Sequence, residues 1–209
     1  DSNDVENAKV TISDNMFVDC TKLTSIDLSN VSLNDEKIGK NAFKGCTALS
    51  EVKFATNTKT ISKNAFSGCT ALTAVDLANS QTETIEKDAF QNCTSLATLS
   101  LPATGLTSIG ASAFNGNAIK HITIPSSVTT IGDAAFANCS ALEQITMSKD
   151  WSGKFSNAVK APEGYAVGLR WYKDGTQVTP ASCFSGESAT PQTFEYVPIF
   201  FFDVEYNGN

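Results

Sequence analysis

The chain has 209 residues and a formal net charge of −7, from 15 basic and 22 acidic side chains. It therefore lacks the basic stripe that marks a nucleic-acid-binding surface, and no apolar run approaches the length of a membrane span. The length allows one elongated array with a small additional segment. Because the chain starts at Asp1, without a methionine or an apolar leader, we expect a processed precursor.

A short pattern recurs six times along the chain, and its clearest copy covers residues 85–101. The apolar positions of that copy are Ile85, Ala89, Phe90, Cys93, Leu96, Leu99 and Leu101. The copies are 26, 23, 24, 24 and 22 residues apart, measured between Phe17, Phe43, Phe66, Phe90, Phe114 and Phe136. A fixed period in this range predicts a solenoid, in which each coil buries its apolar side chains against the next coil.

The copies divide the first part of the chain into coils. Residues 1–9 are polar, and we expect them to fray or to form part of an N-terminal cap. A degenerate first coil follows over 10–29, and a polar connection over 30–37 lengthens the first step. Coils two to six then run over 38–148. We therefore divide the chain into a solenoid of about six coils over 1–148 and a second segment over 149–209.

Each coil contains two kinds of strand signal. Alternation at the end of the pattern, as at Leu99 and Leu101, predicts a strand. Strands that recur in register predict a parallel sheet, with coils about 4.8 Å apart. Residues 84–86 and 130–132 predict a second, shorter strand. Between the strands, the spacing of apolar residues predicts a short α- or 3₁₀-helix over 87–92, which makes the fold an α/β solenoid.

Two residue types recur at fixed positions inside the coils. The six phenylalanines predict a stacked column. The repeated cysteines are Cys20, Cys46, Cys69, Cys93 and Cys139. Their parallel Cβ directions suit disulfides poorly, and no histidine accompanies them as a metal ligand. We therefore expect buried free thiols and no metal or cofactor. The fifth copy lacks the cysteine, which we interpret as a tightened turn over 115–117, and Cys183 lies outside the pattern.

The pattern ends at about Lys149, and the remaining residues indicate a small β-rich segment. Alternating residues over 165–171 predict a strand, and Lys173-Asp-Gly-Thr176 predicts a hairpin turn. Two further strands are expected over 194–197 and 199–206, with Pro198 between them. The segment can be a cap on the last coil or an independent domain, and both alternatives stay open.

The outward positions of the predicted strands form a polar stripe that is our candidate partner-binding face. Its residues, which we call the strand face, are Glu51, Lys53, Asp76, Thr98, Ser100, His121, Thr123, Gln144 and Thr146. His121 is the only histidine, and its lateral neighbours should be Thr98 and Gln144. Asp76 lies two coils away, at about 10 Å, so no catalytic triad is expected. The stripe also lacks tryptophan and tyrosine, the usual anchors of a tight interface.

The run Ile-Gly-x-x-Ala-Phe-x-x-Cys-x-x-Leu over 131–142 and the strand over 119–125 resemble the BspA-type leucine-rich repeat of surface proteins. The resemblance covers residues 12–147. It implies a right-handed superhelix, export or surface display, and a non-catalytic role in adhesion. The implied partner is a protein or glycan on a host or bacterial surface, bound by a monomer. The alternative is a structural spacer with no binding site of its own.

Overall fold

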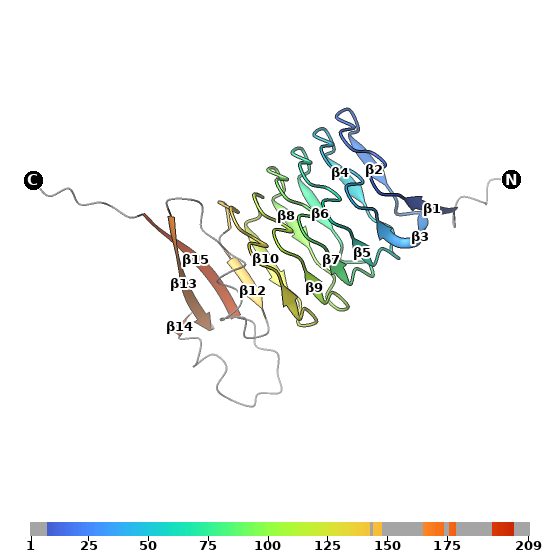
Figure 1. Ribbon diagram of the computed structural model, residues 1–209. Coiled ribbons are helices and arrows are strands. Elements are labelled where there is room, and N and C mark those ends of the chain that lie inside the picture. The colour runs from blue at the N-terminus through green and yellow to red at the C-terminus, as the bar shows by residue number, and fades with distance from the viewer. Residues whose placement is uncertain (1–7, 143, 148–164, 174–175, 179–193, 203–209) are drawn as a thin grey trace, which may run out of the picture.

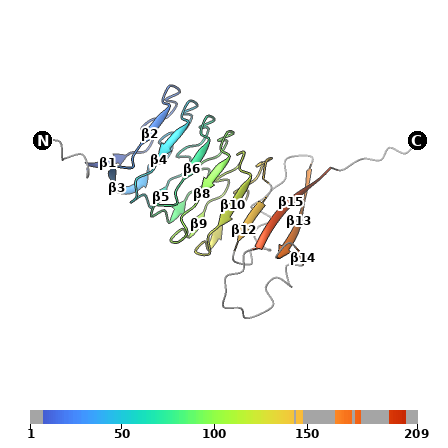
Figure 2. The same ribbon diagram turned by 180° about the vertical axis from the view of Figure 1, so that it is seen from behind.

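The computed structural model describes residues 8–142, 144–147, 165–173, 176–178 and 194–202. Figure 1 shows a row of coils that runs from β1 to β12, and Figure 2 shows the same row from behind. Successive coils stack through parallel strands, and each coil contributes strands to two separate rows. The solenoid predicted from the repeat is confirmed.

The first row of strands forms one continuous parallel sheet, which we call the spine sheet. Its members, in order, are β1 (Ala8–Ile12), β3 (Val31–Ile38), β5 (Thr60–Ile61), β7 (Thr84–Ile85), β9 (Ser108–Ile109) and β11 (Thr130–Ile131). One isoleucine from every strand lies in register with the next, as Ile61 does with Ile85 and Ile85 with Ile109. The short strands predicted over 84–86 and 130–132 therefore carry the unbroken hydrogen-bond ladder.

The second row is divided into separate sheets. It comprises β2 (Ser25–Asp27), β4 (Glu51–Lys53), β6 (Ala74–Asp76), β8 (Thr98–Ser100), β10 (His121–Ile124) and β12 (Gln144–Met147). β2 pairs with β4, β6 with β8, and β10 with β12. The prediction of one continuous sheet on this side is wrong, because the ladder stops after β4 and again after β8.

The short helix predicted over 87–92 is also wrong, and turns take its place. The residues two before and two after each repeat phenylalanine have positive φ, as at Asp88 (59°) and Asn92 (58°). Two left-handed residues four apart cannot belong to an α-helix, which needs φ near −63° throughout. The backbone bonds instead to the next coil: the amide of Phe66 donates to the carbonyl of Ala89 at 2.8 Å. Most of these positions hold Asn, Asp or Gly, which tolerate this conformation best.

The phenylalanine column is confirmed and forms the centre of the core. Neighbouring ring centroids, from Phe17 to Phe136, lie 5.0–5.5 Å apart with interplanar angles of 2–12°. The cysteines of coils two, three, four and six are buried and free, as predicted, and Cys20 of coil one is free but exposed. Each buried thiol donates to a backbone carbonyl of an earlier coil, as Cys69 does to Phe43 at 3.2 Å. Cys183 lies outside the described residues.

Among the described residues, three strands follow the last coil: β13 (Tyr165–Lys173), β14 (Thr176–Val178) and β15 (Phe194–Phe202). β15 pairs antiparallel with β12 and with β13, so one sheet continues in the order β10-β12-β15-β13-β14. The two strands expected on either side of Pro198 are a single strand. Only residues 194–196 of β15 pair with β12. On that side Pro198 therefore has no partner strand within the described ranges, and its missing backbone N–H breaks no hydrogen bond of the sheet.

Candidate binding face

The structure places seven of the nine strand-face side chains, those in β4, β6, β8 and β10, on the surface of the second row of strands. All seven are exposed or half-exposed, and they alternate with the buried residues Val52, Val75, Leu99 and Ile122. Gln144 and Thr146 of β12 pair in register with His121 and Thr123. The expected neighbour relation of His121 and Gln144 is therefore confirmed. Thr98 and His121 share no ladder, because β8 and β10 belong to different sheets.

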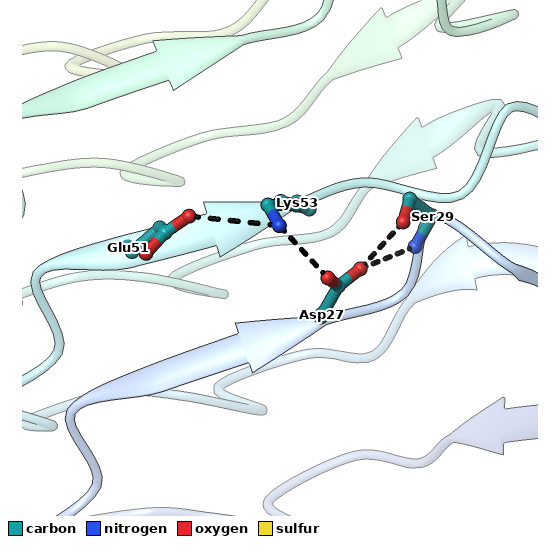
Figure 3. A network of polar contacts seen from close by, with 4 residues as sticks. All are labelled: Asp27, Ser29, Glu51 and Lys53. Atoms are coloured by element: carbon teal, nitrogen blue, oxygen red, sulfur yellow. Dashed lines mark hydrogen bonds and ion pairs between the residues drawn. The ribbon is translucent and has the colours of Figure 1, made fainter.

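Charged residues are concentrated at the N-terminal end of this row, where one ammonium lies between two carboxylates (Figure 3). The Lys53 ammonium lies 3.0 Å from Oδ2 of Asp27 and 3.9 Å from Oε1 of Glu51. Oδ1 of Asp27 accepts hydrogen bonds from the hydroxyl and the amide of Ser29, at 2.6 and 3.0 Å. Asp27 and Ser29 were not among the predicted site residues, although an aspartate two residues before a serine at a strand end is a recognisable turn signal.

These contacts change the ionisation of both partners. The pKa of Asp27 falls to about 2, chiefly because the Ser29 hydroxyl donates to the carboxylate, followed by the Ser29 amide and Lys53. The pKa of Lys53 is raised, first by its hydrogen bond to Asp27. Both groups therefore stay charged at neutral pH, and the Asp27–Lys53 ion pair adds no net charge with which a binding partner could interact.

The C-terminal end of the row, β8, β10 and β12, carries no Asp, Glu, Lys or Arg side chain. Thr98 and Ser100 of β8, and His121 and Thr123 of β10, supply hydroxyl and imidazole groups. Gln144 and Thr146 extend the same neutral composition into β12. The strand face is thus divided into a charged half and a neutral, hydrogen-bonding half.

A groove opens at each break in the second row. The groove between β8 and β10 has a volume of about 470 Å³ and is lined by Leu99, Ser100, Leu101, Ala103, His121, Ile122, Thr123 and Pro125. The groove between β4 and β6 is smaller, about 240 Å³, and its lining includes Lys53 and Asp76. The break between β4 and β6 coincides with Phe54, which takes the repeat position of Leu77 in the next coil. The ring of Phe54 packs edge-on against Phe66, with 5.7 Å between the ring centroids.

The larger groove lies where the fifth coil is one residue short. Thr98 follows Phe90 by eight residues, whereas His121 follows Phe114 by seven. The turn over 115–117 keeps the shape of its neighbours, since Gly116 has the same φ of 77° as Gly68. The shortening therefore falls after the turn, between Asn117 and Ile119, and not within it as the sequence suggested. Asn117 occupies the missing cysteine's place and is buried.

The buried thiols are poorly suited to chemistry. Burial raises the pKa of Cys93 to about 12 and that of Cys139 to about 11, so both remain protonated and weakly nucleophilic at neutral pH. Over the described ranges, no group of three His, Cys, Asp or Glu side chains is placed to hold a metal ion. In the same ranges, no helix is long and apolar enough to cross a membrane.

Comparison with known proteins places this repeat in a family. Six copies of the BspA type leucine rich repeat region match residues 10–143. The match begins in β1 and ends immediately before β12, so it covers the solenoid except for its last strand. No curated protein matches the sequence significantly.

Two solved bacterial structures are similar to this chain. A leucine rich cell surface protein from Faecalibacterium prausnitzii is 27% identical over 76% of this chain, with a TM-score of 0.53. A leucine-rich repeat protein from Eubacterium ventriosum is 33% identical over 65% of this chain, also with a TM-score of 0.53. The chain spans 40% and 35% of the lengths of these two proteins.

Proposed function

The chain belongs to the BspA-type leucine-rich repeat family, and we propose that it is a non-catalytic adhesion module, displayed on a cell surface or secreted. Proteins built from leucine-rich repeats typically bind other macromolecules and generally act as scaffolds without enzymatic activity. The similar protein from Faecalibacterium prausnitzii is described as a cell surface protein, which supports the proposed localisation.

The exposed strand face is the observation that carries this proposal. It presents polar side chains from successive coils on one side of the solenoid, with the apolar residues between them buried. Such a surface suits a protein or a glycan on a host or bacterial surface. Among its nine residues there is no tryptophan or tyrosine, so one copy should bind weakly. Display of many copies should strengthen binding through avidity.

The test compares bead-displayed variants for binding to host cells, bacterial cells and matrix. The variant Asp76→Lys, His121→Ala, Gln144→Ala alters three positions of the strand face and should lose most binding. A matched control changes exposed residues outside the strand face, Glu83→Lys, Gln81→Ala and Thr104→Ala, and should bind like the unmodified protein. Equal binding by all three proteins would remove the strand face from the proposal.

The alternative function is a structural spacer that holds another domain away from the surface. The Lys53 ammonium is paired with the carboxylates of Asp27 and Glu51, and this pairing favours the spacer, because charges that already have a partner in the chain offer less to another molecule. If bead-displayed protein binds none of the cells or matrices, the spacer becomes the better explanation.

A further inference from the structure

We propose that the groove between β8 and β10 binds a neutral saccharide of one or two sugar rings. This inference rests on the proposed function, since it names the ligand class for one part of the strand face. It starts from the position of the groove, which opens where two stacked strands belong to different sheets. A ligand there meets strand edges as well as side chains.

The lining of the groove combines apolar and hydroxyl groups. Leu101, which is half-exposed, and Ala103, which is exposed, supply apolar carbon, while Ser100 and Thr123 supply hydroxyls on the two sides. Neither hydroxyl forms a hydrogen bond to another protein group within residues 8–142. A hydroxyl both donates and accepts, which suits the paired hydroxyls of a sugar, and the C–H surface of a pyranose ring fits an apolar wall. A volume of about 470 Å³ lies within the range of small-ligand sites.

The charge of the lining restricts the ligand to a neutral one. The groove between β8 and β10 is lined by no Asp, Glu, Lys or Arg, in contrast to the groove between β4 and β6, where Lys53 and Asp76 lie. A basic ligand would lose hydration in the larger groove without gaining an ion pair, and an acidic ligand would find no Lys or Arg there, only His121. A neutral, hydroxyl-rich ligand avoids this cost.

The spacing of the coils argues against a peptide strand in the same place. On the spine sheet, β7 and β9 remain hydrogen-bonded, and the rings of Phe90 and Phe114 are 5.4 Å apart. Coils four and five are therefore one strand spacing apart. Inserting a strand between β8 and β10 would need two spacings, about 9.5 Å, so a peptide strand does not fit there. A saccharide instead lies across the groove and places only single hydroxyl groups between the two strands.

The experiment is an NMR titration of the full chain, labelled with ¹⁵N, with lactose and with chitobiose. At least one of these neutral disaccharides should shift the amides of Leu99, Ser100, Ile122 and Thr123. The variant Ser100→Ala, Thr123→Ala should bind that sugar about tenfold more weakly, since each hydrogen bond contributes roughly 0.5–1.5 kcal/mol. The control Asn79→Ala, in the smaller groove, should bind like the unmodified protein.

Several results would overturn this inference. They are no shift at these amides with either disaccharide, equal affinity in the double variant, or shifts produced only by acidic 3′-sialyllactose or by an uncharged peptide. The bead assay separates this failure from that of the proposed function. If beads bind cells through the strand face while lactose and chitobiose neither compete nor shift the groove amides, the adhesion role stands and the saccharide site is wrong.

Discussion

The thiol of Cys93 donates a hydrogen bond to the carbonyl of Phe66, with 3.1 Å between sulfur and oxygen. The same contact joins Cys46 to Phe17 and Cys69 to Phe43. In the fifth coil, Asn117 takes the cysteine position and is only 3% exposed. Neither polar atom of its amide group has a hydrogen-bond partner among the described residues. The fifth coil therefore buries a polar group where its neighbours bury a satisfied thiol.

We expect Asn117→Cys to stabilise the protein. An unpaired buried polar group costs about 1–3 kcal/mol. A cysteine at position 117 would remove that cost, because its thiol could donate to a backbone carbonyl as the cysteines of the other coils do. The free energy of unfolding, measured by chemical denaturation in reductant, should rise by about 1–2 kcal/mol. The reciprocal change, Cys93→Asn, should lower it by a similar amount. A neutral or destabilising Asn117→Cys would contradict the assignment of Asn117 as an unpaired buried polar group.

The features that depend on repeat spacing could be predicted from the sequence. The phenylalanine column, the free thiols and the exposed alternation of the strand face all follow from residues that recur at one position. The division of the second row of strands could not, because it depends on local exceptions: one missing residue after Asn117, and a phenylalanine at position 54. The helix predicted over 87–92 rests on apolar spacing alone, whereas Asp88 and Asn92 are residue types that favour left-handed φ and so prevent a helix.

The positions with positive φ also indicate where a residue of the repeat is unfavourable for stability. Ala134 has a φ of 57°, although the equivalent residues of coils two and three are Asn41 and Asn64. An alanine pays a steric cost in this conformation that asparagine largely avoids. Ala134→Asn should therefore raise the free energy of unfolding by about 0.5–1 kcal/mol, and Asn64→Ala should lower it comparably. Thermal and chemical denaturation of the two variants test this pair, and the same sign for both would refute it.

Titration of Asp27 tests the network in Figure 3. Its pKa of about 2 lies below the usual 3.8, so its contribution to stability is fully present above pH 4 and is lost as the pH falls towards 2. Ser29→Ala should raise the pKa towards 3.8, because the Ser29 hydroxyl is the largest cause of the shift. Lys53→Ala should raise it less. Carboxyl chemical shifts measured by NMR between pH 1.5 and 6 decide the order, and a larger effect of Lys53→Ala would reverse our explanation.

The first phenylalanine of the column should contribute less to the free energy of unfolding than one in the middle. Phe90 is fully buried between two rings, at 5.1 and 5.4 Å. Phe17 is half-buried and has one ring neighbour in the column, at 5.1 Å. Phe90→Ala should cost about 3–5 kcal/mol, and Phe17→Ala clearly less, since its site can relax. Urea denaturation of both variants measures the difference. Equal costs would mean that residues 10–29 belong to the interior of the array.

The C-terminal strands should protect the last coil from association. β12 is hydrogen-bonded to β10 on one side and to β15 on the other. Without β15, the backbone groups of β12 would form an open strand edge, which invites pairing with other chains. A protein that ends at Lys149 should therefore aggregate or lose cooperative unfolding.

Light scattering and urea denaturation of the truncated and full-length proteins measure these two properties. A matched control removes only residues 203–209, which follow β15, and should unfold like the full chain. If the protein ending at Lys149 stays monomeric and unfolds cooperatively, the edge of β12 needs no cover. Residues 149–209 would then be an independent domain, and their pairing with β12 would contribute little to the stability of the solenoid.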